Sequence, residues 1–211
     1  MSFELSSRLS ITSLKGGGLR LKHILIRMTF EKGEFREGNG TYTQIENYEE
    51  EYMEKILENI GKIERNIKVV LDCGNAVPGP LAVKALERLG VEVIPIYCEW
   101  DNSFPNHPPD PTRQSNMIDL GKSVIEHGAE FGIGMDGDGD RLGVVDENGE
   151  FIHPDRLIGI FAKDVLAKIT KDSTDDERTI LFDVKCSMAV EEAIHNLGGI
   201  PRMVRTGHTF M

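Results

Sequence analysis

The 211-residue sequence predicts an α/β protein of three α/β/α layers around a mainly parallel sheet, with one complete domain and the beginning of a second similar one. Three observations predict this fold. Short apolar runs alternate with segments of helical periodicity from about residue 45 onward. Polar or glycine-containing turns follow the apolar runs, as expected at the carboxyl ends of parallel strands. Gly, Pro and Asn-Gly mark the boundaries between the segments.

The first part of the pattern predicts helix, strand, helix and strand. An acidic stretch that starts near Gln44 has apolar residues at helical spacing, and 67–71 is a short, mostly apolar strand that ends in a turn at Asp72. Pro80 suits the first position of the next helix, and 91–97 is the next strand. The apolar positions of the two helices are Tyr48, Tyr52, Met53, Ile56 and Ile60, then Ala82, Ala85, Leu86 and Leu89.

A proline-rich, exposed loop at 99–113 then leads to a helix at 114–127. The apolar run 131–135 predicts a strand. Asn148-Gly149 predicts a tight hairpin between the strand at 142–145 and the short apolar pair that follows the turn. The proposed complete domain therefore ends its sheet in a hairpin.

The last part of the chain repeats the pattern. Pro154 begins a strongly periodic helix, and the acidic stretch 171–178 is expected to be a linker. A strand at 179–184, a helix capped by Ser187 and a strand at 201–204 follow. The apolar face of the helix after Pro154 is Ile158, Phe161, Ala162, Val165, Leu166 and Ile169.

Charge and hydropathy exclude several classes of partner. The formal net charge of -11 would repel a nucleic-acid backbone or an anionic membrane. No stretch approaches the 18 apolar residues of a membrane span. Cys73, Cys98 and Cys186 are too few and too scattered for a disulfide framework or a zinc site, which points to a reducing cytoplasm.

Residues 1–29 differ in composition from the rest, with five strong bases, one acid and many serines. Three explanations remain open. The segment is an organelle leader, although it lacks a sustained amphipathic helix; a disordered tail; or a non-native start, as when a reading frame begins inside a longer gene.

The most informative segment is 136–141, which reads Asp-Gly-Asp-Gly-Asp-Arg between two apolar runs. Asp136, Asp138 and Asp140 would repel one another strongly unless a cation sat among them. Arg141 offers a planar fork for a phosphate or carboxylate. The segment therefore predicts a divalent cation beside an anionic ligand, against the alternative of a solvated acidic turn.

A calcium-binding EF-hand is a rival interpretation, because Glu147 falls at position twelve when Asp136 is counted as one. The fit fails inside the loop. Arg141 occupies the position of the required glycine, and the flanks predict strands where an EF-hand needs helices.

Taken together, the motifs resemble the phosphohexomutase family, in particular its bacterial phosphomannomutase/phosphoglucomutase branch. The resemblance rests on 136–141 followed by Val-Val-Asp at 144–146, on Phe-Asp-Val-Lys-Cys-Ser at 182–187, and on Arg-Thr-Gly-His at 205–208. It runs from about Phe30 to the last residue and implies three regions. These are the tail of the first mutase domain at 30–44, the second domain at 45–172, and the truncated start of the third at 173–211.

The resemblance also implies a reaction. In the family a phosphoserine exchanges its phosphoryl group with a hexose phosphate through a bisphosphate intermediate, and hexose 1-phosphate and 6-phosphate, of mannose or glucose, interconvert. Asp136, Asp138 and Asp140 would bind Mg2+. Arg141 would contact the sugar phosphate as a catalytic residue, and Lys185 and His208 would contact substrate, with His208 also able to exchange a proton.

One departure from the family affects the expected activity. No serine lies in the Ser-His-Asn-Pro context of the family's phosphoserine; the nearest string, at 103–109, has similar letters in another order and is expected to be the proline-rich loop of the second domain. The fourth domain is also expected to be absent, which favours a truncated or frame-disrupted product. We therefore expect no mutase activity from this chain alone, and a non-catalytic metal-binding or interaction remnant is the alternative.

Overall fold

The computed structural model describes residues 33, 41, 43, 46–170 and 172–207. The expectation for residues 1–29, most of the expected first-domain tail, and His208 lie outside the described residues. The described strands form one five-stranded and one two-stranded sheet, each with its own helices.

The five-stranded sheet confirms the predicted α/β class. Its strands are β1 (Lys68–Asp72), β2 (Glu92–Ile96), β3 (Phe131–Met135), β4 (Leu142–Val145) and β5 (Phe151–Ile152), in the order β2-β1-β3-β4-β5. Strand β1 pairs in parallel with both β2 and β3. Strands β4 and β5 add on antiparallel, as the Asn-Gly turn predicted. The parallel strands β1 and β3 thus end at the same edge of the sheet.

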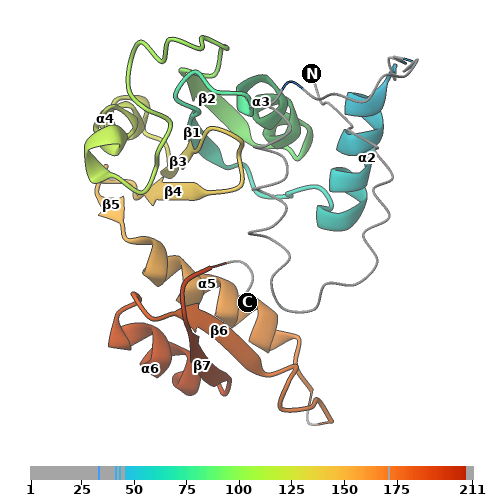
Figure 1. The fold of residues 1–211 in the computed structure, drawn as a ribbon, viewed down its shortest axis with the longest axis vertical. Helices are drawn as coiled ribbons and strands as arrows, with labels where there is room; N and C mark the ends of the chain where they lie inside the picture. Colours follow the sequence, from blue (N-terminus) through green and yellow to red (C-terminus); the bar gives the residue numbers. More distant parts are fainter. Residues whose placement is uncertain (1–32, 34–40, 42, 44–45, 171, 208–211) are drawn as a thin grey trace. The chain divides into compact units, whose positions relative to one another are not determined.

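Helices cover both faces of this sheet, which gives the three predicted layers. Helix α3 (Gly79–Arg88) packs on one face and α4 (Ile118–His127), which continues the 3-10 turn η1 (Gln114–Met117), packs on the other, as Figure 1 shows. Because side chains of a strand alternate, Leu71 of β1 lies in the core beneath α3 while Val70 lies in the core beneath α4.

Helix α2 (Tyr48–Ile60) forms within the predicted acidic stretch, but most of its apolar stripe is not core. Met53 is buried, whereas three members of the predicted stripe are exposed. The helix is joined to α3 by a bidentate pair between Arg88 and Glu50, at 2.6 and 2.7 Å. The exposed members are Tyr48, Tyr52 and Ile60.

The two-stranded sheet pairs β6 (Thr179–Asp183) in parallel with β7 (Ile200–Val204), joined through α6 (Met188–Asn196). Helix α5 (Pro154–Ala167) shares a core with this unit. The Asp155 carboxylate at its start accepts a 3.0 Å hydrogen bond from the Ser187 backbone N–H. The buried members of the core are Ala162, Leu166, Phe182, Val190 and Ile194. The domain boundary expected after residue 172 stays a prediction.

The remaining sequence expectations concern membranes and thiols. Within the described residues, no helix is both long and apolar enough to cross a bilayer. Cys73 and Cys98 are buried, Cys186 is partly buried, and all three are free thiols.

Candidate metal centre

The acidic loop connects β3 to β4 at the carboxyl end of β3. The hairpin is in register down to the pair Met135 and Leu142, so residues 136–141 span the turn itself. Because β1 runs parallel to β3, the turn that follows Asp72 lies at the same sheet edge. The position at a strand end matches the sequence prediction.

Arg141 folds back onto Asp136, the first residue of the turn. The Arg141 backbone N–H donates to Asp136 Oδ1 at 2.9 Å, and its Nε donates to Oδ2 at 2.8 Å. Arg141 Nη2 lies 2.7 Å from the same Oδ2. Asp136 is 1% exposed, whereas the Arg141 side chain is 56% exposed, so the arginine covers a buried carboxylate from the solvent side.

This pairing keeps Asp136 ionised. Burial alone would raise the pKa of Asp136, but the hydrogen bonds and positive charge of Arg141 outweigh it and the pKa is lowered from its usual 3.8. The charge of Asp136 in turn raises the pKa of the Arg141 guanidinium. A buried anion is therefore held at the base of the loop at neutral pH.

The other two carboxylates complete a cation-sized cluster. Asp138 and Asp140 are exposed, and one oxygen from each of them and from Asp136 lie within 4.8 Å of one another. Oxygen ligands at about 2.0 to 2.1 Å from Mg2+ lie roughly 3 to 4 Å apart. The oxygens of the cluster lie near that spacing and two of the three side chains are exposed, so the residues fit a hard divalent cation. Strands rather than helices flank the loop, which excludes an EF-hand.

The proline-rich loop supports the hairpin, a contact that sequence reasoning missed. Gly134 and Gly143 face each other across β3 and β4. A methyl group placed on Gly143 would lie 2.6 Å from the Pro111 carbonyl oxygen, and one on Gly134 would lie 2.7 Å from Met117 Sδ. Pro111 and Met117 thus occupy the space that two missing side chains leave.

The same loop reaches the arginine of the turn. Asp110 Oδ1 lies 3.9 Å from Arg141 Nη1 and accepts a 2.6 Å hydrogen bond from the Thr112 hydroxyl. The hydrogen bond from the Thr112 hydroxyl is the largest of the effects that lower the pKa of Asp110. Asp110 and Asp136 together place two negative charges around one guanidinium.

The predicted substrate contacts belong to the two-stranded unit. Lys185 follows β6, where its backbone N–H donates to Asp183 Oδ1 at 2.8 Å and its Nζ lies 3.9 Å from Oδ2. The Lys185 side chain is 72% exposed. The Thr206 side chain also forms a hydrogen bond with Asp183, and this bond is the largest of the effects that lower the pKa of Asp183. The loops after β6 and β7 therefore meet at this carboxylate. His208 lies just beyond the described residues.

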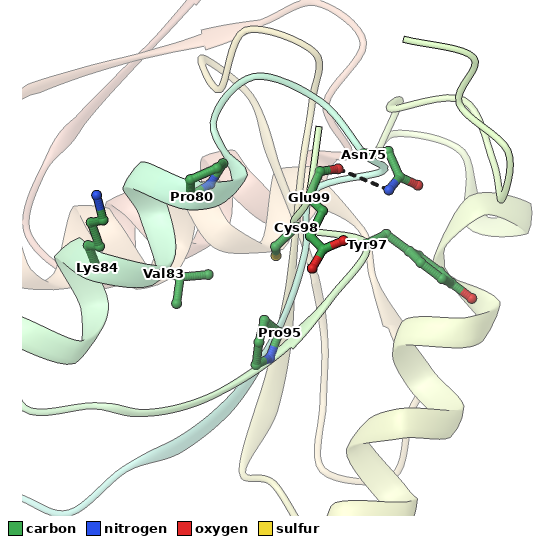
Figure 2. Close-up of a pocket in the computed structure, with 8 residues that line it drawn as sticks. All are labelled: Asn75, Pro80, Val83, Lys84, Pro95, Tyr97, Cys98 and Glu99. Atoms are coloured by element: carbon green, nitrogen blue, oxygen red, sulfur yellow. Dashed lines mark hydrogen bonds between the residues drawn. The ribbon is translucent and has the colours of Figure 1, made fainter. Parts of the chain in front are cut away.

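A cavity of about 540 Å³ lies elsewhere, between α3 and the end of β2 (Figure 2). Asn75, Val83 and Tyr97 are among its lining residues, and the Asn75 side-chain amide donates to the Glu99 carbonyl at 3.0 Å. None of the predicted site residues lines this cavity.

These features define the class of protein: an α/β/α domain with a candidate metal centre in an acidic hairpin at the carboxyl edge of its sheet. Comparison with known proteins then gives the family. The model described as Phosphoglucomutase/phosphomannomutase, alpha/beta/alpha domain II matches residues 50–149. The model for domain III of the same name matches residues 153–211. The chain belongs to the phosphoglucomutase/phosphomannomutase family.

Relatives of known function agree. The chain is 41% identical over 186 residues to a phosphomannomutase/phosphoglucomutase of Pseudomonas aeruginosa, covering 88% of this chain and 38% of that protein. It is 39% identical over 176 residues to a phosphoglucomutase of Neisseria meningitidis, covering 83% of this chain and 36% of that protein. The chain therefore spans little more than a third of the length of these relatives.

Solved structures show the same fold. A phosphoglucomutase/phosphomannomutase family protein from Burkholderia thailandensis superposes with a TM-score of 0.77 at 36% identity, covering 89% of this chain and 40% of that one. A putative phosphomannomutase from Thermus thermophilus superposes with a TM-score of 0.65 at 18% identity, covering 80% and 38%, and supports the fold alone.

Proposed function

We propose that this chain carries the Mg2+ loop and part of the sugar-phosphate contacts of a phosphohexomutase. The whole enzyme would interconvert hexose 1-phosphate and hexose 6-phosphate, of mannose or glucose, through a phosphoserine and a hexose bisphosphate intermediate. The observation that carries the proposal is the three-carboxylate hairpin inside the segment that matches domain II. The names of the relatives support the substrate class.

Asp136, Asp138 and Asp140 would hold the Mg2+. When bound, the ion supplies neutralisation of charge on the phosphoryl group that is transferred. The protein's contribution would be one carboxylate kept buried and ionised, with two exposed carboxylates as the further ligands. That division suits a site that must exchange ions with solvent.

Arg141 remains able to bind a phosphate although it covers Asp136. A guanidinium has five N–H donors, and Asp136 contacts only Nε and Nη2 of Arg141. Donors on Nη1 are therefore left for a phosphate. Lys185 and His208 would contact the sugar phosphate from the loops after β6 and β7. The free thiols and the negative charge favour a cytoplasmic location without nucleic-acid or membrane partners.

Calorimetric titration with Mg2+ tests the metal assignment. Asp138→Ala removes an exposed ligand without disturbing the core and should abolish detectable binding, because two carboxylates hold the ion poorly. Asp175→Ala, which removes an exposed carboxylate between α5 and β6, is the matched control and should bind as the wild-type chain does. Equal Mg2+ binding by the Asp138→Ala chain would refute the assignment.

A further inference from the structure

A second buried carboxylate lies close to the metal loop, at the end of β1. Asp72 is 2% exposed. Its Oδ1 accepts a hydrogen bond from the Gly74 N–H at 2.8 Å, and its Oδ2 lies 2.9 Å from His107 Nε2. His107 comes from the middle of the proline-rich loop. The contact therefore fastens that loop to the carboxyl end of a core strand.

The arrangement requires a proton between the two side chains. His107 Nδ1 lies 2.9 Å from the Pro108 carbonyl oxygen, which can only accept, so Nδ1 carries a hydrogen. The remaining nitrogen then needs one more proton, shared with the carboxylate, or two lone pairs would face each other. The pair Asp72–His107 is thus held together by one bridging proton and is neutral overall.

Other groups around the ring favour that proton. The Tyr97 ring meets His107 edge-on with ring centroids 5.6 Å apart. The Tyr97 hydroxyl bonds Asp119 at 3.4 Å, and Lys122 Nζ bonds the same carboxylate at 2.9 Å. Burial lowers the pKa of His107, but the Pro108 carbonyl, Asp72 and Asp119 raise it, and the net shift is upward. Tyr97 holds this position with a φ of 51°, a strained value for a bulky residue.

From His107, contacts run directly to the metal hairpin. The Pro108 carbonyl also accepts hydrogen bonds from the Asp110 N–H at 2.8 Å and from the buried Asn116 amide at 3.1 Å. Asn116 binds the Asp110 carbonyl as well, at 3.0 Å. Three donors at one carbonyl fix the backbone of residues 108–110.

This fixed segment touches the acidic loop at two points. Pro109 fits between two glycines: methyl groups placed on Gly74 and Gly137 would lie 3.0 and 3.8 Å from its Cα and Cγ. Gly137 separates the first two carboxylates of the metal cluster. Asp110 lies beside Arg141, the partner of Asp136. A change at His107 can therefore reach the cluster through one short, packed segment.

We propose that Asp72 and His107 are positioning residues for the metal loop: they fix the segment 108–110, which in turn holds Gly137 and Arg141 in the geometry that binds the divalent cation. The inference rests on the proposed Mg2+ site. It assigns a role to two residues that contact neither the cation nor the sugar phosphate.

The first test is Mg2+ affinity of the whole chain at pH 7, measured by calorimetry. His107→Phe fills the same space without either hydrogen bond and should weaken Mg2+ binding about tenfold, the lower end of the range for partners that orient metal ligands. His195→Phe, at an exposed position of α6, is the matched control and should leave affinity unchanged. Far-UV circular dichroism establishes that each variant is folded.

The second test uses Asp72→Asn, which replaces the bridging proton by an amide N–H. The introduced side-chain amide can donate to a neutral His107 while its oxygen still accepts from Gly74. A histidine pKa raised in the folded state contributes stability that is lost as pH rises through that pKa. Wild-type Mg2+ affinity should therefore fall as pH rises above the ordinary histidine value of 6.5 and through the raised pKa of His107, whereas the Asp72→Asn chain should keep its affinity over the same rise.

The outcomes separate this inference from the proposed function. No Mg2+ binding by the wild-type chain would overturn both. Wild-type binding that His107→Phe leaves unchanged in a folded chain would overturn the positioning role alone. So would parallel pH profiles for wild type and Asp72→Asn, since only the variant can hold the loop without the bridging proton.

Discussion

Asp136 keeps its negative charge in a buried position because Arg141 approaches both of its oxygens. The two residues have separate expected roles in the family, one toward the cation and one toward the phosphate. In the structure they also bind each other, through the Arg141 backbone and side chain. A single ion pair therefore joins the proposed cation site to the proposed phosphate site, and we expect loss of either partner to affect both.

Arg141→Ala should lower the free energy of unfolding at pH 7, because it leaves the buried carboxylate of Asp136 without its charged partner. The solvent exposure of Arg141 keeps the loss smaller than that of a fully buried pair. The lowered pKa of Asp136 means that its contribution is present above pH 3.8 and is lost as pH falls below it. Wild type and variant should therefore converge in acid.

Urea denaturation at about pH 7 and about pH 3 in Mg2+-free buffer measures the effect. Arg202→Ala, which removes an exposed arginine on β7, is the control and should change stability by less than about 0.5 kcal/mol. A difference between wild type and Arg141→Ala that stays constant with pH would contradict the electrostatic explanation.

At the scale of elements, the hairpin β3–β4 is shaped by side chains that are missing. Gly143→Ala should destabilise the chain by about 1 to 3 kcal/mol, because the new methyl group would meet the backbone of Pro111 and cannot be relieved by a rotamer change. Gly159→Ala in α5 should do the opposite and stabilise by roughly 0.5 to 1 kcal/mol, since its methyl group would meet only ordinary contacts.

Thermal and urea denaturation measure the stability of the two variants. The comparison is matched, because each variant adds one methyl group to a glycine. Gly143→Ala should also weaken Mg2+ binding, because Pro111 lies one residue from Asp110 and shares its loop. Equal stability of both variants would show that the proline-rich loop can shift to accommodate a methyl group at Gly143 at little cost in stability.

The elements themselves were largely predictable from periodicity. Apolar runs of four or five residues and the Asn-Gly turn placed β1, β3, β4 and β5 within about one residue, because buried strands leave a continuous apolar signal. Helix α2 lies within the predicted stretch, but more of its apolar side chains are exposed than the helical spacing suggested. Periodicity reports which residues share a face and not whether anything covers that face.

The contacts of the proline-rich loop were not predictable in the same way. Its residues lack periodicity, and glycines such as Gly134 give no signal about which neighbour fills the space beside them. His107 illustrates the limit at the site: a histidine between prolines is typical of an exposed loop, yet its partner Asp72 is 35 residues away in the chain. Pairings between residues that lie far apart in the sequence can be identified only when the fold is known.

At the scale of the whole molecule, α5 unites with the second sheet through one continuous core. Ile194→Ala removes a fully buried side chain and should cost about 2 to 5 kcal/mol. Hydrogen exchange should show amides of α5, α6 and β6 losing protection together, while β1 and α4 keep theirs. Loss of protection confined to α6 would show that α5 is not part of that cooperative unit. The control Glu192→Ala, exposed on the same helix, should leave all amides protected.

The chain by itself should show no mutase turnover, because its 211 residues contain no Ser-His-Asn-Pro sequence to supply the phosphoserine. A coupled assay with glucose 1-phosphate or mannose 1-phosphate, a hexose bisphosphate and Mg2+ measures this. Turnover clearly above the blank, and absent from the Asp138→Ala chain, would mean that another residue accepts the phosphoryl group. A chain that binds Mg2+ without turnover would match the proposal.

The two glycines that face each other across β3 and β4 also make one methionine a chemical reporter. Met117 is 3% exposed, and a methyl group placed on Gly134 would lie 2.7 Å from its sulfur. Because the thioether is buried, we expect peroxide to oxidise it slowly while the proline-rich loop and the β3–β4 hairpin stay packed together, and faster when they separate. The oxidation rate of Met117 should therefore rise when the proline-rich loop separates from the β3–β4 hairpin, and Mg2+ bound at the proposed site should slow it.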